Sequence, residues 1–178
     1  MSLSFSSWMR SLIQRVCCPS QPSLKHQTGI EVPSDETASA KPERATWVSP
    51  YIMVKDVDQA VTFYNQAFSF ETVERIPGED GSTWHAELRY QDQLIMLGKV
   101  GVYGSTAKSP IMSQVESPIN QYIYVKDVDQ FYTKAIKAGA KHVVKPEDMF
   151  WGDRMCKLKD LDDYVWCFAT FLGEPEKM

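Results

Sequence analysis

Hydrophobic positions along the chain follow two periodicities in turn. Residues 51–54 form a short run of β-branched and aromatic side chains, which is typical of a strand. Within residues 57–68 the apolar positions recur at helical spacing. Three further strand-like runs follow, at residues 70–77, 82–90 and 93–100. The pattern predicts one strand, one helix and three strands, separated by turns rich in Gly, Asp and Gln.

The same order of elements returns in the second half of the chain. The segment YIMVKDVDQ at residues 51–59 recurs as YIYVKDVDQ at residues 122–130, with eight of nine positions identical. Each copy carries an Asp suited to cap a helix N-terminus, and Gly139 follows the second helical stretch, where a helix end favours glycine. Three more strand-like runs occupy residues 141–147, 153–160 and 164–171. Duplication of one supersecondary unit explains this self-similarity.

The two units together predict an α+β domain in which the βαβββ unit is used twice, with helices on one face of each sheet. We place the domain at residues 47–174, with the first repeat at about 47–101 and the second at about 117–174. Its length is sufficient for one hydrophobic core.

Residues 1–46 have a different composition. The part from residue 19 to residue 44 is rich in Pro, Ser, Thr, Lys and Glu and has no aromatic residue, which indicates a flexible linker. Before it, residues 5–16 would form an amphipathic helix without acidic residues. This start is either a disordered leader, an organelle transit segment, or a membrane-surface helix that Cys17 and Cys18 could anchor. We expect a cytoplasmic protein, with organelle targeting as the alternative.

Charge and motif content exclude several classes of function. The net charge of −4 and the pI of about 5.4 do not favour nucleic-acid binding. No apolar run approaches the ~20 residues that span a bilayer, and four cysteines do not form the framework of a small secreted scaffold. Gly-rich phosphate loops, CxxC pairs and GxSxG elbows do not occur, so we expect no nucleotide cofactor.

Four stretches of the domain resemble the vicinal-oxygen-chelate superfamily, and within it the glyoxalase/bleomycin-resistance, PhnB-like branch. They are PYIMVKDVDQAVTFYNQAFSFE, WHAELRYQDQLIML, YIYVKDVDQFYTKAIKAGAK and FWGDRMCKLKDLDDYVWCFAT. The resemblance implies a curved mixed sheet with a concave ligand cavity, and a homodimer. Function depends on the site rather than on the fold.

Superfamily members that do metal chemistry place His, Gln or Glu ligands at four strand positions. The resemblance maps these positions to Ser49, Met96, Asn120 and Cys167 of this chain. Divalent metals favour carboxylates, carbonyls or imidazoles, and one thiolate does not make a site. We therefore expect no metal and no other cofactor, and glyoxalase or dioxygenase activity is not favoured.

Candidate ligand-binding residues come from the strands and from one loop. His85 could act as a general base or hydrogen-bond a ligand, or it could be structural, and Trp84 should point to the opposite face. The loop FWGDRM at residues 150–155 offers aromatic rings, a glycine for close approach and Arg154 for an anion, unless Arg154 pairs with Asp153 or Glu147. The full candidate set is Trp84, His85, Tyr124, Trp151, Gly152, Arg154, Trp166 and Cys167.

Cys156 and Cys167 raise a question of strand register. If a tight hairpin pairs Lys159 with Tyr164, then Cys156 lies opposite Cys167 on the same sheet face. The two thiols would then form either a redox-sensitive pair or two small buried hydrophobic residues.

These observations favour a small-molecule-binding protein without the usual metal ligands, which sequesters or senses an aromatic or amphipathic ligand. The first alternative is a glyoxalase-like lyase or isomerase that uses a metal or His85. The second is a dimeric scaffold, with membrane association through the leader.

Overall fold

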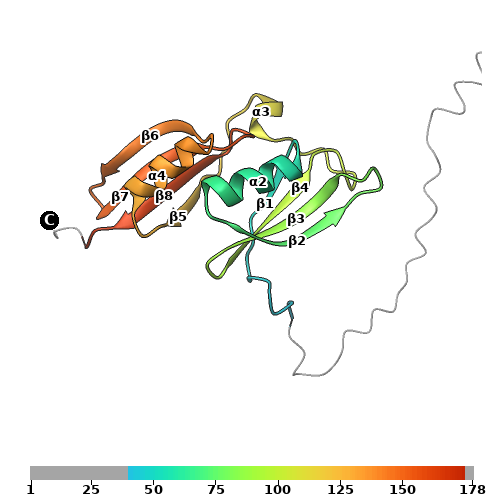
Figure 1. The fold of residues 1–178 in the computed structure, drawn as a ribbon, viewed down its shortest axis with the longest axis horizontal. Coiled ribbons are helices and arrows are strands. Elements are labelled where there is room, and N and C mark those ends of the chain that lie inside the picture. Colours follow the sequence, from blue (N-terminus) through green and yellow to red (C-terminus); the bar gives the residue numbers. More distant parts are fainter. Residues whose placement is uncertain (1–39, 175–178) are drawn as a thin grey trace, which may run out of the picture. The chain divides into compact units, whose positions relative to one another are not determined.

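The structure is a computed structural model that describes residues 40–174. The helix expected at residues 5–16 and most of the expected linker lie outside the described residues. In the described part of the chain, no helix is long and apolar enough to cross a membrane. Figure 1 shows two similar groups of strands, each with one long helix.

Within residues 40–174, eight strands and two long helices follow one another in the order that the sequence predicts, and one short helix lies between the repeats. The first repeat contains β1 (Tyr51–Val54), α2 (Val57–Ala67), β2 (Glu71–Pro77), β3 (Thr83–Tyr90) and β4 (Gln93–Lys99). The second contains β5 (Gln121–Tyr124), α4 (Val128–Lys137), β6 (Lys141–Asp148), β7 (Asp153–Lys159) and β8 (Val165–Phe171), and α3 (Pro110–Ser113) lies between them. The predicted α+β class with a repeated βαβββ unit is confirmed.

Each repeat builds its own four-stranded mixed sheet. The strand orders are β1-β4-β3-β2 and β5-β8-β7-β6, so the two sheets have the same topology. In both, the first strand runs parallel to the last, and the remaining neighbours are antiparallel. Within the described residues the strands therefore form two sheets rather than one continuous sheet.

Both long helices begin at the aspartates that the repeat predicts. The side chain of Asp56 accepts a hydrogen bond from the Gln59 amide, and that of Asp127 accepts one from the Gln130 amide, each at 2.9 Å. At the end of α4, Gly139 has φ of 100°, a conformation that costs glycine little. Local sequence therefore sets where each helix starts and where α4 ends.

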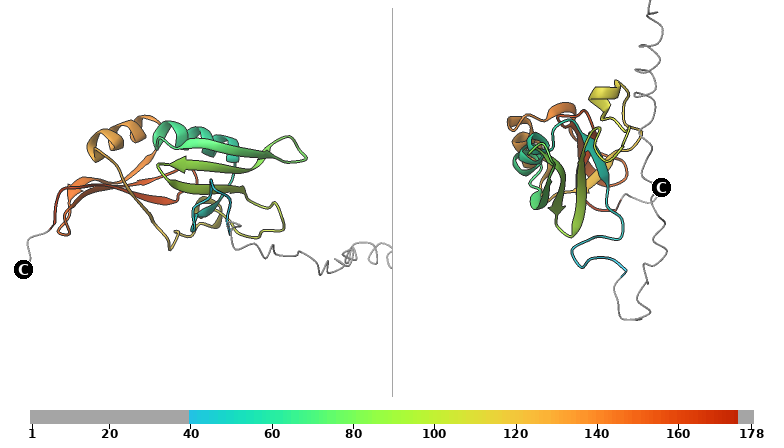
Figure 2. Two further views of the ribbon diagram at one scale, coloured as in Figure 1. Left: turned by 90° about the horizontal axis from the view of Figure 1, so that it is seen from below. Right: turned by 90° about the vertical axis from the view of Figure 1, so that its right-hand side faces the viewer.

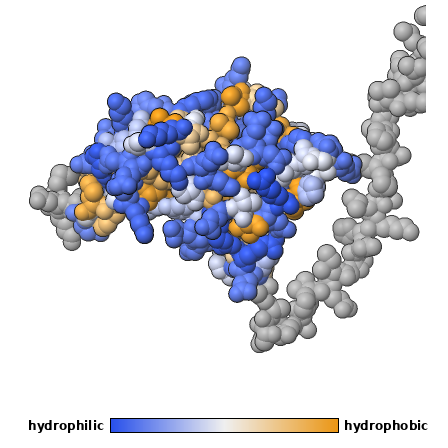
Figure 3. Space-filling view, viewed as in Figure 1, coloured by the Kyte–Doolittle hydropathy of each residue, from blue (hydrophilic) through white to orange (hydrophobic). Residues whose placement is uncertain are grey.

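The core lies between the helices and one face of each sheet. Figure 2 shows α2 and α4 on the same side of the two sheets. A single cluster of buried side chains includes residues from both helices and both sheets. In the view of Figure 3, which matches that of Figure 1, mainly hydrophilic residues cover the helices, with smaller hydrophobic patches between them.

Aromatic rings join the two repeats within this core. Phe68, which follows α2, lies 5.5 Å from Trp166 and 4.8 Å from Phe168 between ring centroids, and both partners belong to β8. Phe70 lies 5.8 Å from Trp166. Because Phe68, Trp166 and Phe168 have no exposed surface, each repeat supplies part of the other's core.

A buried carboxylate lies at the same junction. Asp160, which directly follows β7, accepts hydrogen bonds from the Tyr64 hydroxyl of α2 at 2.6 Å and from the Trp166 indole at 2.8 Å. Its other oxygen accepts the amides of Asp162 and Tyr164. Among the described residues no cation pairs with it, and burial raises its pKa to about 6.

Candidate functional site

The face of each sheet that points away from the helices is here called its open face. In β1 the side chains of Ile52 and Val54 are buried in the core, so Tyr51 and Met53 lie on the opposite face. The register then assigns the neighbouring positions in the other strands. The open face of the N-terminal sheet carries Tyr51, Met53, Glu74, Ile76, His85, Glu87, Arg89, Leu94, Met96 and Gly98.

His85 and Tyr51 form a polar pair on this face. The His85 Nδ1 atom lies 3.3 Å from the Tyr51 hydroxyl, and the rings meet edge to face with centroids 5.5 Å apart. Gly98 allows this arrangement, because a Cβ atom there would lie 2.8 Å from the Tyr51 hydroxyl oxygen. Burial raises the pKa of Tyr51, so its hydroxyl stays protonated near neutral pH. The pair places two groups that can donate or accept hydrogen bonds on this face.

The chain segment before β1 covers another part of the same face. The guanidinium of Arg44 contacts Glu74 at 2.7 Å and Glu87 at 3.0 Å. Arg89 donates a hydrogen bond to the Arg44 carbonyl at 2.7 Å. Leu94, which lies opposite Arg89, has no exposed surface. Part of the N-terminal open face is therefore occupied by the chain itself.

The open face of the C-terminal sheet carries a cluster of aromatic side chains around one carboxylate. The Oδ2 atom of Asp153 accepts hydrogen bonds from the hydroxyls of Tyr122 at 2.7 Å and Tyr124 at 3.1 Å. It also accepts the Trp151 indole N–H at 3.0 Å. Asp153 is only 2% exposed. We call these four residues the Asp153 cluster.

Small side chains on the intervening strand allow this cluster to form. Asp153 belongs to β7 and the tyrosines to β5, and β8 lies between those strands. The register places Cys167 beside Tyr122 and Ala169 beside Tyr124. Because these β8 side chains are short, the tyrosine hydroxyls reach across them to Asp153. Cys167 and Ala169 are buried beneath, together with Met155.

The environment keeps the tyrosines of the cluster protonated. Burial, followed by the hydrogen bond to Asp153, raises the pKa of Tyr122 to about 12. The hydrogen bond to Asp153 is the main cause of the raised pKa of Tyr124. Both hydroxyls are therefore hydrogen-bond donors at neutral pH.

Four of the eight residues expected at the site lie together at the C-terminal sheet. Tyr124 and Trp151 belong to the Asp153 cluster, and Cys167 lies under Tyr122. Gly152 occupies the turn before β7 with φ of 94°, and its carbonyl accepts the Leu172 amide. His85 also lies on an open face, but on that of the N-terminal sheet.

Arg154 does not face this cluster. Its guanidinium donates to both oxygens of Asp129, in α4, at 2.7 and 2.9 Å, and to Asp148, in β6, at 2.7 Å. These partners place it on the helix side of the sheet, and they differ from the Asp153 and Glu147 named from the sequence. Arg154 thus joins α4, β6 and β7 in an ion-pair network.

The two tryptophans at strand positions also lie away from the open faces. Trp166 has no exposed surface and contacts the core aromatic rings. Trp84 lies on the face opposite His85, as expected, where its indole donates to Asp80 and its ring meets that of Tyr103. A Cβ atom on Gly78 would overlap this indole, so Trp84 packs on the β2–β3 hairpin.

The expected register of the last hairpin is wrong by one residue. Lys159 pairs with Val165 rather than Tyr164, so Cys156 lies opposite Phe168 and Lys157 lies opposite Cys167. A shift of one position moves a side chain to the other sheet face. Cys156 therefore points into the core and Cys167 to the open face, and both are free thiols. The turn differs because the Asp160 side chain binds the amides of Asp162 and Tyr164.

The four positions of the superfamily's metal ligands fall into two pairs. Ser49 precedes β1 and Met96 lies beside Tyr51, so both belong to the N-terminal sheet. Asn120 precedes β5 and Cys167 lies beside Tyr122, so both belong to the C-terminal sheet. Within residues 40–174, no group of three or more His, Cys, Asp or Glu side chains gathers in metal-binding geometry.

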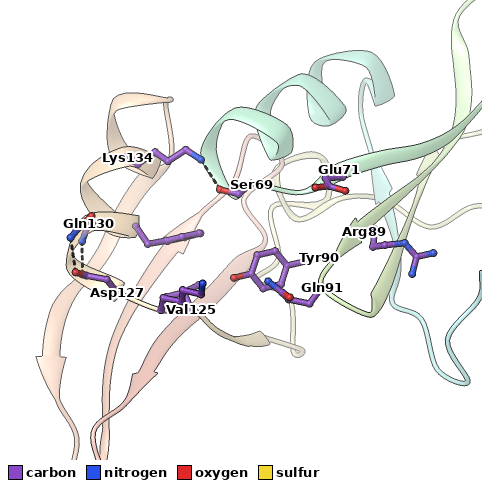
Figure 4. A pocket seen from close by; sticks show the side chains of 11 residues that line it. Ser69, Glu71, Arg89, Tyr90, Gln91, Val125, Asp127, Gln130 and Lys134 are labelled. Atoms are coloured by element: carbon purple, nitrogen blue, oxygen red, sulfur yellow. Dashed lines mark hydrogen bonds between the residues drawn. The ribbon is translucent and has the colours of Figure 1, made fainter.

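A polar groove of about 720 Å³ lies elsewhere, between the repeats. Figure 4 shows Lys134 of α4 reaching Ser69, which follows α2, and the Tyr90 side chain lying near Val125. The groove contains charges of both signs, including Glu71, Asp127 and Lys134. Two of its charged side chains already have partners in the chain, because Asp127 caps α4 and Lys134 donates to Ser69.

Sequence reasoning missed Asp153 and Tyr122 as site residues. Asp153 was considered only as a partner for Arg154. Tyr122 matches Tyr51 of the first copy and gave no signal from the repeat, whereas the expected residue Tyr124 is the single position at which the two nine-residue copies differ. That difference adds the second hydroxyl that reaches Asp153.

Comparisons with known proteins support the family that the sequence resembles and the fold described above. The model of the Glyoxalase/Bleomycin resistance protein/Dioxygenase superfamily matches residues 44–168. Uncharacterized proteins of Mycobacterium bovis and Mycobacterium tuberculosis are each 34% identical to this chain over 130 residues. The match covers 72% of this chain, 82% of the M. bovis protein and 74% of the M. tuberculosis protein.

Solved structures agree at lower identity. TioX from Micromonospora sp. ML1 is 24% identical with a TM-score of 0.57, covering 70% of this chain and 99% of its own. A mutant of the fosfomycin resistance protein FosX from Listeria monocytogenes, in complex with Mn(II), is 15% identical with a TM-score of 0.52. This match covers 70% of this chain and 87% of the FosX chain. These structures share the fold. With its duplicated βαβββ topology and a family model that matches most of its length, the chain belongs to the glyoxalase/bleomycin resistance protein/dioxygenase superfamily.

Proposed function

We propose that this protein binds an aromatic or amphipathic small molecule on its open sheet faces, without a divalent metal, and so sequesters or senses it. The observation that carries the proposal is the set of large rings left exposed there. Tyr122, Tyr124 and Phe171 on the C-terminal sheet and Tyr51 on the N-terminal sheet are each between 43% and 57% exposed. Aromatic rings on one surface, three of which carry a hydroxyl, favour flat or amphipathic ligands.

The donor set at the superfamily's metal positions supports a metal-independent role. Ser49, Met96, Asn120 and Cys167 offer a hydroxyl, a thioether, an amide and a thiol. Hard and borderline divalent ions favour carboxylate and imidazole ligands. Burial also raises the pKa of Cys167, so the thiolate form that binds metals is disfavoured. These residues do not fit a divalent centre.

A homodimer is part of the proposal. In one chain the open faces leave apolar rings in contact with water, and patches of this kind mark interaction sites. A second copy would cover them and turn two exposed faces into an enclosed cavity. The described chain forms two sheets rather than one cup, which agrees with this arrangement.

Elemental analysis and ligand binding test the proposal together. The full chain is exposed to nickel, zinc, manganese or iron(II), desalted and analysed for metal. We expect less than stoichiometric metal, whereas about one ion per chain would contradict the metal-independent role.

The ligand half of the test is an NMR screen of neutral aromatic compounds against the same protein. We expect shifts confined to residues of the open faces. Shifts only in the groove around Tyr90 and Lys134, or no shifts at all, would contradict binding on those faces.

The His85–Tyr51 pair favours a second candidate, a lyase or isomerase that uses His85 as a general base. Its Nδ1 atom contacts a hydroxyl that stays protonated, and the pair lies on an open face. Turnover of a glyoxalase-type substrate that is lost in His85→Gln would favour this candidate over binding alone.

A further inference from the structure

Asp153 lacks the countercharge that a buried carboxylate normally has. It is 2% exposed, and none of the ion pairs in the described part of the chain includes it. Neighbouring Arg154 is held on the other face of the sheet by Asp129 and Asp148. Buried charges in proteins are usually paired with an opposite charge. Within residues 40–174, therefore, no cationic side chain pairs with the Asp153 carboxylate.

The hydrogen bonds of Asp153 leave one side of the carboxylate available. All three donors, from Tyr122, Tyr124 and Trp151, bind Oδ2. Oδ1 accepts no hydrogen bond within the described residues. An ionised carboxylate accepts at about four lone-pair positions, so Oδ1 has capacity for a further donor.

Aromatic surface surrounds this carboxylate. The three donors direct their polar edges to Asp153 and are 40% to 57% exposed. Phe171 is the register partner of Asp153 in β8 and is 56% exposed, and Phe150 meets Trp151 edge to face with ring centroids 4.9 Å apart. Aromatic faces attract ammonium ions through their quadrupoles, and aromatic cages around a charge are a common way to bind such ions.

We propose that the Asp153 cluster binds an organic ammonium ion, with Asp153 as the ion-pair partner and the surrounding rings as the cage. This inference rests on the proposed function and narrows it to cationic ligands that carry an apolar body. A neutral aromatic ligand would leave Asp153 unpaired, and an anion would be repelled by it.

Three matched probes test the inference: tryptamine, tryptophol and indole-3-acetate, which share the indole and differ in charge. Affinities are measured by titration calorimetry on the full chain. We expect tryptamine to bind roughly ten-fold more tightly than tryptophol, and indole-3-acetate more weakly than both.

Two variants locate the effect. Asp153→Asn should abolish the preference for tryptamine while tryptophol still binds. Asp148→Asn removes the same charge from the same sheet but on the helix side, and it should retain the preference. Trp151→Phe keeps an aromatic ring and the carboxylate, so it should reduce the preference only partly, and it provides the test if Asp153→Asn does not fold.

The outcomes separate this inference from the proposed function. Equal affinity for tryptamine and tryptophol, or a preference that survives in Asp153→Asn, overturns the cationic ligand and leaves neutral aromatic binding in place. No binding of tryptamine at millimolar concentration also overturns it, and the NMR screen of neutral compounds then decides the proposed function separately.

Discussion

At the scale of single residues, the two buried carboxylates have different surroundings. Asp160 lies in the core between the repeats and receives four hydrogen bonds, which satisfy both of its oxygens. Asp153 lies beneath the aromatic rings of an open face, with all three donors on one oxygen. The first carboxylate has hydrogen bonds on both oxygens, whereas the second has none on Oδ1 within residues 40–174.

Asp160 should make stability depend on pH between about 4 and 6. Its pKa is about 6 in the folded state, above the ordinary value of 3.8, so the folded state holds the proton more tightly. Below about pH 4 both states are protonated and the group contributes nothing. Between about pH 4 and pH 6 the unfolded state loses its proton first, so the free energy of unfolding falls by an amount on the order of 3 kcal/mol, and above pH 6 it no longer changes.

Urea unfolding of the wild type and Asp160→Asn from pH 4 to pH 7 measures this cost. The variant should be less stable at pH 4, because Asn has one acceptor oxygen where Asp160 uses both of its oxygens to accept four hydrogen bonds, and the difference should shrink as pH rises. Asp92→Asn changes an exposed carboxylate and should run parallel to the wild type. A difference independent of pH would contradict the buried ionisation.

The thiols should remain independent. Cys156 and Cys167 lie on opposite faces of the sheet, and burial raises the pKa of Cys156 to about 12. We expect peptide mapping of the oxidised, folded protein to show no disulfide between Cys156 and Cys167. Formation of a Cys156–Cys167 disulfide before unfolding would contradict the register of β7 and β8.

At the scale of elements, α2 depends on the second repeat for one of its hydrogen bonds. The Tyr64 hydroxyl reaches Asp160 at 2.6 Å inside the core. Tyr64→Phe leaves that carboxylate with one donor fewer and should lower the free energy of unfolding by about 1–3 kcal/mol. Chemical denaturation of the wild type and the variant measures this difference in the free energy of unfolding.

Tyr132→Phe is the matched control on α4. The Tyr132 hydroxyl meets His142 at 3.0 Å in an exposed contact, so its loss should cost less than about 1 kcal/mol. Equal losses of unfolding free energy in the two variants would mean that burial of the Tyr64 hydrogen bond does not add to stability.

Elements were predictable from the sequence, and side-chain directions were predictable only in part. The repeat, the capping aspartates and the alternation of apolar residues placed the strands and long helices within one or two residues of their positions. The β7–β8 turn was not predictable, because the side chain of Asp160 organises it and shifts the register. The direction of Arg154 followed from Asp129 on α4, a contact between distant elements.

At the scale of the whole molecule, the proposal of a homodimer can be measured directly. We expect light scattering to give twice the chain mass of 20.3 kDa. Phe171→Lys puts a charge on the C-terminal open face and should favour the monomer. Leu161→Lys changes a residue of similar exposed character in the β7–β8 turn beside α2 and should leave the dimer intact. A monomeric wild type would contradict the proposal.

The shared aromatic core has a consequence for the history of the chain. Tyr64, Phe68 and Phe70 of the first repeat are covered by Trp166 and Phe168 of the second, so either half alone would expose rings that only the other shields. Each copy of the duplicated unit now depends on the other copy to bury these rings. Either half would need several of these aromatic residues replaced at once before it could fold alone. Residues of the open faces do not have this mutual dependence, so they could change one at a time.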